Sequence, residues 1–267
     1  MRALRGLRGE LAKRLRRTPS HAQLAGDLAG RELLFHAPPL TPELVRAIAA
    51  ITPQFHLEAD EGSRRVWELS QNGSSWAEWQ ALGPLLESLP RPRRVLELGP
   101  GLGRSVVFFK KKLGWGEVPF DLFEGEGPRH KYPLSAPRSA DSFCGDFAAL
   151  AAVLEYNGIT KAEIVDAAAS GGRLAGLPGP YDLVYSFYGV GFHWRLEDFW
   201  DEIRPLLGSS GVGIFTVHRG FAEFPALDAV AHGRLEIPRI LAKDRSLELF
   251  VVSPQAARLR PFVGALA

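Results

Sequence analysis

The sequence has little cysteine and no long apolar run. Cys144 is the only cysteine among the 267 residues, which excludes a disulfide within the chain and a cysteine-rich metal site and fits a reducing compartment. No apolar run approaches the roughly 20 residues that cross a bilayer. Arginines interrupt the leucines of the N-terminus, where a secretory signal would need an apolar core. We therefore expect a cytoplasmic protein without membrane contact.

The net charge is also small, +2, but it is distributed unevenly. Residues 1–17 hold seven basic side chains and one acidic side chain, and leucines recur among them at helical spacing. This pattern predicts an amphipathic helix. We expect the helix to dock on the protein body or to join copies of the chain into a homo-oligomer. Contact of its basic face with a nucleic acid is the alternative, although no nucleic-acid partner is expected.

The chain divides into two parts. Residues 1–90 contain no convincing strand and predict a helical extension or lid, with one helix starting at Pro42 after the N-cap Thr41 and another running from about Ser74 to Leu89. In residues 91–267, short apolar runs alternate with helix-length segments, which is typical of a parallel sheet covered on both faces.

The predicted fold is α/β: a doubly wound, mostly parallel seven-stranded sheet with a C-terminal antiparallel hairpin and an N-terminal helical extension. Strands are expected at residues 94–98, 118–124, 181–187, 211–218, 235–241 and 247–252, with a weaker one at 142–144. The strands at 235–241 and 247–252 are separated by a short polar segment, so we expect them to be antiparallel neighbours.

A glycine-rich loop follows the first predicted strand directly. It contains Gly99, Gly101 and Gly103, and a helix is expected to start near Arg104. Glycines allow the chain to turn sharply and bring backbone N–H groups close to a ligand, and the positive end of the helix points to the same place. Open α/β sheets bind ligands at this carboxyl edge. The loop is therefore the candidate binding site.

The glycine spacing distinguishes between ligands. Dinucleotide-binding motifs place a third glycine at the position that Arg104 occupies here, and its side chain would obstruct the close approach that this motif permits. Instead the third glycine comes one residue earlier, and Glu97 lies two residues before Gly99. This pattern resembles motif I of the class I S-adenosylmethionine-dependent methyltransferases. The resemblance implies that Gly99, Gly101 and Gly103 hold the methionine part of S-adenosylmethionine, and that Glu97 helps to hold its amino end.

Later segments resemble the same family in order and spacing, over about residues 94–253. The resemblance implies that Glu124, which ends the second predicted strand, binds the ribose hydroxyls, with Glu126 as the alternative if that strand end is misplaced. Asp146 and Phe147 would meet the adenine, although Asp146 could instead cap the following helix. Residues 181–186 resemble the family's fourth strand, and the resemblance implies that Ser186 is a further cofactor contact.

The segment after the fourth strand, Phe-His-Trp at residues 192–194, is similar to segments found at this position in several methyltransferases. Residues 185–194 also resemble the bacterial sugar O-methyltransferase-like group. His193 is a candidate general base because its pKa lies near working pH, and His218, at the end of the fifth predicted strand, is a second candidate. Either histidine could instead have a purely structural role.

Aromatic residues suit a small organic or sugar-like acceptor. The candidate substrate contacts are Trp67, Trp76, Tyr188 and Trp194. A local helical core is the alternative for the two N-terminal tryptophans. The polar residues His56, Glu58, Asp60 and Glu61 match no metal-ligand spacing, so we expect a solvated loop and no metal site.

Together these patterns predict an S-adenosylmethionine-dependent methyltransferase that acts by in-line displacement on a small-molecule acceptor, with the hydroxyl of a sugar or natural product favoured. The Asn-Pro-Pro-Tyr and Asp-Pro-Pro-Tyr motifs of nucleobase amine methylation do not occur in the sequence. Three alternatives remain: an RNA- or protein-directed methyltransferase using the basic arm, a nicotinamide-dependent oxidoreductase, and a binding module without catalytic activity.

Overall fold

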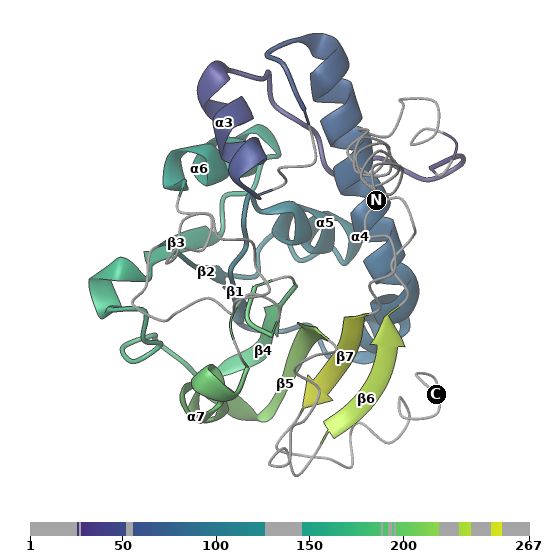
Figure 1. Cartoon of the computed structure of the whole chain (residues 1–267). Helices are drawn as coiled ribbons and strands as arrows, with labels where there is room; N and C mark the ends of the chain where they lie inside the picture. The colour runs from purple at the N-terminus through teal and green to yellow at the C-terminus, as the bar shows by residue number, and fades with distance from the viewer. Residues whose placement is uncertain are drawn as a thin grey trace, which may run out of the picture.

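A single sheet organises the part of the chain that the computed structural model describes, namely residues 26, 28–51, 56–125, 146–187, 189–191, 194, 196–218, 230–235 and 247–252 (Figure 1). The strands of this part are β1 (Val95–Leu98), β2 (Phe120–Glu124), β3 (Ala162–Asp166), β4 (Tyr181–Ser186), β5 (Leu207–His218), β6 (Val230–Leu235) and β7 (Leu247–Val252). The helices are α3 (Pro42–Ile51), α4 (Glu61–Ser88), α5 (Arg104–Lys112), α6 (Phe147–Tyr156), the 3-10 turn η1 (Ala168–Ser170) and α7 (Glu197–Leu206).

The strand order is β3-β2-β1-β4-β5-β7-β6. The first five strands of the chain pair in parallel, whereas β7 is antiparallel to both of its neighbours, β5 and β6. The predicted α/β class with a parallel sheet is thereby confirmed. The chain builds outward from β1 to β3 and then returns to place β4 on the other side of β1. Ligands of open α/β sheets bind at such a reversal, beside the carboxyl ends of the strands.

One strand was placed differently from its prediction, and one was missed. The structure has β6 at Val230–Leu235, whereas 235–241 was predicted, and residues 236–241 lie outside the described residues. The third strand, β3, was missed: it lies at Ala162–Asp166, and the weaker candidate at 142–144 falls outside the described residues. As an edge strand, β3 is half-exposed and carries charged side chains, so it lacks the continuous apolar run that marks the central strands.

The first predicted helix is confirmed, and the second begins earlier than predicted. The hydroxyl of Thr41 accepts the N–H of Leu44 at 3.2 Å, one turn into α3. Helix α4 starts at Glu61 rather than near Ser74, because Asp60 caps it by accepting the N–H of Ser63 at 2.6 Å. Ser74 does not interrupt the helix, since its hydroxyl donates to the carbonyl of Ser70, 3.0 Å away.

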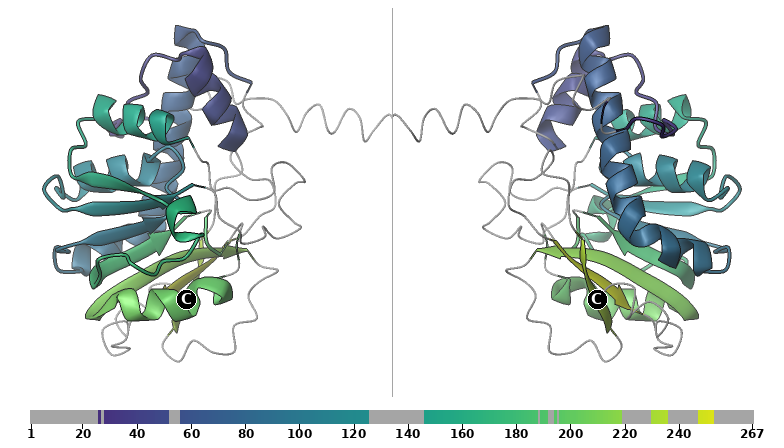
Figure 2. Two further views of the ribbon diagram at one scale, coloured as in Figure 1. Left: turned by 90° about the vertical axis from the view of Figure 1, so that its left-hand side faces the viewer. Right: turned by 90° about the vertical axis from the view of Figure 1, so that its right-hand side faces the viewer.

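The N-terminal helices share one hydrophobic core with the helix that follows the glycine loop. Phe35, Ile48 and Leu82 belong to the same buried cluster as Val107 and Phe108 of α5. Figure 2 shows α3 and α4 on the flank of the sheet. The division at residue 90 stays a prediction, but the packing ties both sides of it together. Residues 1–17, with the expected basic helix, lie outside the described part, and none of the described helices is long and apolar enough to span a membrane.

Candidate cofactor-binding site

All three glycines of the loop adopt left-handed backbone conformations, with φ of 71°, 59° and 75° at Gly99, Gly101 and Gly103. A Cβ atom on Gly103 would lie 2.9 Å from Leu154 and 3.0 Å from Leu150, so this glycine also lets α6 approach the start of α5 closely. At Gly101 a Cβ atom would meet only the Cδ1 of Ile51, at 3.8 Å. The middle of the loop is therefore open on one side, next to the end of α3.

The N–H groups of the loop glycines bond to the sheet and to an acid. Gly99 donates to the carbonyl of Phe123 in β2, and Gly103 to that of Pro100, both at 3.0 Å. Gly101 donates to Oε2 of Glu124 at 3.0 Å, and the other oxygen of this carboxylate accepts the N–H of Gly125 at 3.1 Å. Glu124 is fully buried. The acid expected to bind ribose thus lies against the centre of the glycine loop.

Glu97 is also buried, and both of its carboxylate oxygens accept hydrogen bonds from hydroxyl groups. Tyr185, on β4, donates to Oε2 at 2.7 Å, and Ser105, in the first turn of α5, donates to Oε1. Burial raises the pKa of Glu97 to about 7, although the two hydrogen bonds oppose this effect. The carboxylate therefore joins β1, β4 and α5 immediately behind the loop.

Arg104 begins α5, and its side chain turns toward α4 rather than over the loop. Its two terminal nitrogens donate to the two oxygens of Glu78, each at 2.7 Å, and one of them also donates to Ser75 at 3.2 Å. Contrary to what the sequence suggested, the side chain of Arg104 therefore does not obstruct the loop. What excludes the usual dinucleotide motif is the position of the third glycine, because Gly103 takes over the close helix packing.

The end of β2 is flanked by two side chains. Phe147 is the first residue of α6, and its ring carbon Cζ lies 2.9 Å from where a Cβ atom on Gly125 would be. Asp166 ends β3 directly beside Glu124, and its Oδ1 is 2.8 Å from the same point. Asp166 was missed because β3 was missed; an acid closing a short β-branched run before three alanines was the available signal. Asp146 caps α6 by accepting the N–H of Ala149 at 2.8 Å, which favours the capping alternative.

Ser186 connects the carboxyl ends of β1 and β4. Its hydroxyl donates to the carbonyl of Leu98 at 2.6 Å and accepts the N–H of Val190 at 2.8 Å. A Cβ atom on Gly189 would lie 2.7 Å from that carbonyl and from the same hydroxyl. The chain after β4 thus runs tightly against the start of the glycine loop, and any side chain at position 189 would separate them.

The aromatic candidates lie mostly in the core. Trp67 is buried and packs edge-on against Phe35, with ring centroids 5.3 Å apart. Trp76 packs edge-on against Phe108 at 5.2 Å, and its N–H donates to the carbonyl of Glu32 at 3.0 Å. These positions favour the helical-core alternative over a wall around the acceptor.

The other residues predicted to contact the acceptor or to act as the base are described only in part. Trp194 is buried, and its backbone carbonyl accepts the N–H of Gly191 at 2.6 Å. Tyr188 and His193 lie outside the described residues, as does the side chain of His218, although its backbone ends β5. Within the described ranges, no group of three or more His, Cys, Asp or Glu side chains could hold a metal ion.

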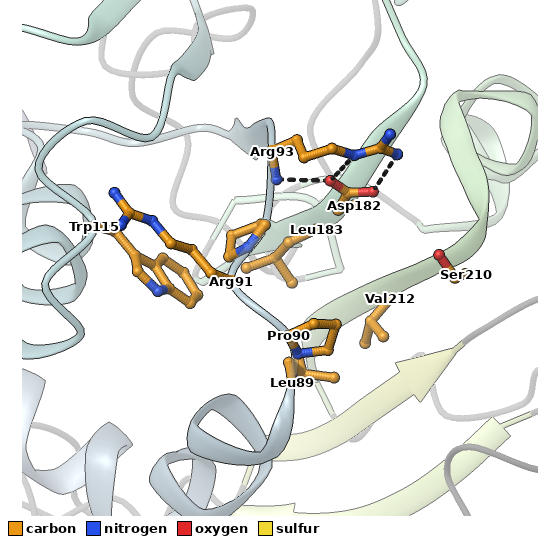
Figure 3. A pocket seen from close by; sticks show the side chains of 10 residues that line it. Leu89, Pro90, Arg91, Arg93, Trp115, Asp182, Leu183, Ser210 and Val212 are labelled. Atoms are coloured by element: carbon orange, nitrogen blue, oxygen red, sulfur yellow. Dashed lines mark hydrogen bonds and ion pairs between the residues drawn. The ribbon is translucent and has the colours of Figure 1, made fainter.

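A pocket of about 200 Å³ lies at the opposite edge of the sheet. Figure 3 shows Asp182 accepting from Arg93 at its rim; Trp115, Leu183 and Val212 also line the pocket. Because Asp182 is the second residue of β4, the pocket is at the amino ends of the strands, away from the glycine loop.

No family model matches the sequence, and a comparison with curated proteins found no match. Among solved structures, the chain is similar to the SAH-bound methyltransferase PaMTH1 of Podospora anserina, with 17% identity, 77% of this chain and 69% of that chain covered, and a TM-score of 0.34. It is also similar to cofactor-bound Rv0187 from MTB, with 16% identity, 80% of this chain and 91% of that chain covered, and a TM-score of 0.44. For MtNAS in complex with MTA and tNA, the identity is 15%, the match covers 79% of this chain and 69% of that chain, and the TM-score is 0.43. Likenesses of this degree do not establish an activity.

Proposed function

We propose that the protein binds S-adenosylmethionine at the carboxyl edge of β1, β2 and β3 and transfers its methyl group to a small organic acceptor. The observation that carries the proposal is the bond from the N–H of Gly101 to the buried carboxylate of Glu124, beside the carboxyl end of β1, where the strand order reverses. It joins the two features with which the motif resemblance began, the glycine loop and the acid that ends the second strand.

The residues present fit this cofactor. Gly101 has open space beside its backbone, as a loop that wraps a ligand requires. The two oxygens of Glu124 suit a pair of ribose hydroxyls, and the ring of Phe147 with the carboxylate of Asp166 lies one strand further along, where an adenine would follow. When bound, the cofactor would supply a methyl group activated by a positively charged sulfur.

The charge of the site favours this donor over a dinucleotide. Glu97 and Glu124 are both buried beside the loop, and each carboxylate accepts hydrogen bonds there from hydroxyl or backbone N–H groups. A diphosphate would bring negative charge toward them in a low-dielectric environment, whereas S-adenosylmethionine brings a sulfonium and an ammonium. This argument supports S-adenosylmethionine over the nicotinamide alternative.

The chain's part in the reaction would be to align donor and acceptor and to exclude water, which can contribute roughly 7–11 kcal/mol to lowering a barrier. A sugar or phenol hydroxyl must also lose a proton, and His193 and His218 stay our candidates for the base. Tyr188 and Trp194 both come after β4 in the sequence, and they stay our candidates for contact with the acceptor.

Calorimetry with S-adenosylmethionine, S-adenosylhomocysteine and NAD⁺ tests the proposal. We expect saturable binding of the first two, and a loss of at least about tenfold in affinity in Glu124→Gln, as removal of a charge-assisted bond predicts. Glu163→Gln is the matched control, because Glu163 is an exposed acid on the neighbouring strand β3. Binding of NAD⁺ without either sulfur compound would overturn the proposal.

The product identifies the group transferred. A sulfonium can lose any of its three carbon substituents, and only methyl transfer leaves S-adenosylhomocysteine. Mass spectrometry of cell extracts incubated with the protein and the donor should therefore show S-adenosylhomocysteine together with a methylated small molecule. Accumulation of 5′-methylthioadenosine instead would mean that the aminocarboxypropyl group is transferred.

A further inference from the structure

Arg104 places a positive charge where the proposed ligand should find none. It is the first residue of α5, directly after Gly103, and the N-terminus of a helix already carries partial positive charge. A cation here is unfavourable for the helix, and it would also repel a cationic ligand held by the preceding loop. The side chain is nevertheless largely buried, 15% exposed.

Glu78 compensates this charge from a different part of the chain. Both of its carboxylate oxygens accept from the guanidinium in a two-pronged geometry, and Glu78 itself is only 3% exposed. Ser75, one turn earlier on α4, accepts a further bond from Arg104. The helix is held in this position by Trp76 and by Trp79, whose ring lies 6.0 Å from that of Phe108 on α5.

The pair lies within electrostatic reach of the loop. Both charges act on Glu97 in β1: Arg104 lowers its pKa and Glu78 raises it, although burial and the hydrogen bonds from Ser105 and Tyr185 are larger effects. The bidentate contact therefore contributes to the local charge beside the loop, in addition to fixing α4 against α5.

We propose that Glu78 is a positioning residue of the cofactor site, which holds Arg104 against α4 and neutralises it so that the glycine loop accepts a positively charged donor. The inference rests on the proposed function. S-adenosylmethionine carries one more positive charge than S-adenosylhomocysteine, because the sulfonium becomes a neutral thioether. Compensation by Glu78 should therefore favour the donor over the product.

The test compares affinities for the two compounds in Glu78→Gln and in a matched control, Glu68→Gln. Glu68 is an equally buried acid on α4 that accepts from Arg65 and from the N–H of Ala37, away from the loop. We expect both variants to unfold at lower temperature than the wild type. Only Glu78→Gln should lose donor affinity selectively, with the ratio of donor to product affinity falling about tenfold.

A double variant separates charge from structural support. In Glu78→Gln with Arg104→Gln both charges are absent, so the preference for the donor should return to within about twofold of the wild type. This variant does not leave the buried Arg104 charge without Glu78, so it provides the measurement if Glu78→Gln alone does not fold. A preference that stays lost in the double variant would overturn the inference.

Failure of the inference can be distinguished from failure of the proposed function. If the wild type binds neither compound, the proposed function is wrong. If the wild type binds both, and the ratio of donor to product affinity is unchanged in Glu78→Gln, only the role proposed for Glu78 is wrong.

Discussion

The stability that the protein loses when Tyr185 loses its hydroxyl should depend on pH in a defined direction. This hydroxyl donates to Glu97 at 2.7 Å, and both residues are buried. Burial raises the pKa of Glu97 from 4.5 to about 7. A group whose folded pKa lies above its unfolded pKa binds more protons when folded, so its contribution destabilises the fold increasingly as the pH rises from 4.5 to about 7. The full effect is about 3 kcal/mol.

The magnitude for Tyr185→Phe follows from the charge of the acceptor. A hydrogen bond to a neutral group contributes about 0.5–1.5 kcal/mol, and one to a charged group about 1.5–3 kcal/mol. At about pH 5 the folded protein holds Glu97 mostly protonated, so the variant should lose about 1 kcal/mol. At about pH 8 the carboxylate is ionised, and the loss should be about 2–3 kcal/mol. The pKa of Glu97 should rise further in the variant.

Urea unfolding of the wild type and variant at these two pH values measures the difference. Tyr181→Phe is the matched control: Tyr181 lies on the same strand and donates to the carboxylate of Asp121 at 2.6 Å, but Arg94 also pairs with that carboxylate, at 2.7 Å. We expect its loss to be the same at both pH values. An equal loss for Tyr185→Phe at both values, or a smaller loss at the higher one, would refute the reasoning.

Three further substitutions test other parts of the structure. Gly103→Ala should destabilise the fold by about 1–3 kcal/mol in urea unfolding, because alanine is strained at a φ of 75° and its Cβ atom would clash with Leu154. The control Gly116→Ala should change the stability little, because a Cβ atom there meets nothing within 4 Å. Asn72→Leu should cost about 3–5 kcal/mol in thermal unfolding, since the buried amide bonds four backbone groups at 2.8–3.1 Å; a loss below about 1 kcal/mol would contradict this role. Ile51→Ala should change the free energy of unfolding by less than about 0.5 kcal/mol, because Ile51 is partly exposed. It should nevertheless weaken the binding of S-adenosylhomocysteine in calorimetry, because Ile51 borders the open side of the loop at Gly101. Unchanged binding would mean that the ligand lies elsewhere.

The loop and the strand before it were predictable because their signals are local. The strand Val95–Leu98, with three apolar residues and Glu97, is followed directly by a loop with three glycines. Each of these glycines has the left-handed backbone conformation that other residues rarely adopt. The acid at the end of β2 was predictable in the same way, because the strand is continuously buried and its end is visible in the sequence.

Elements whose stability comes from tertiary contacts were harder to predict. Helix α4 has little amphipathic periodicity because its polar residues are buried too: Asn72 bonds the segment at residues 34–35, and Glu78 bonds Arg104. Its start was placed too late, since the Ser-Ser pair at 74–75 looked like a cap while Asp60 was the actual one. Strand β3 was missed because, at the edge of the described sheet, it is partly exposed and carries charged side chains instead of a continuous apolar run.

The partners of the site's side chains could not be read from sequence at all. Tyr185 reaches Glu97 from 88 positions away, and Glu78 reaches Arg104 from 26 positions away. Such pairings depend on how β4 and α4 pack, which no local pattern records. The sequence therefore predicted that Glu97 and Glu124 would lie at the glycine loop, while their hydrogen-bond partners came only from the fold.

These partners give the two buried acids of the loop different properties. Glu124 accepts from backbone N–H groups of Gly101 and Gly125, which can only donate and therefore match an ionised carboxylate. Glu97 accepts from two hydroxyls, which can rotate and can themselves accept a proton, so they match either protonation state. Glu97 can thus change charge near neutral pH without losing its partners. A cation bound at this loop would favour the ionised form of Glu97.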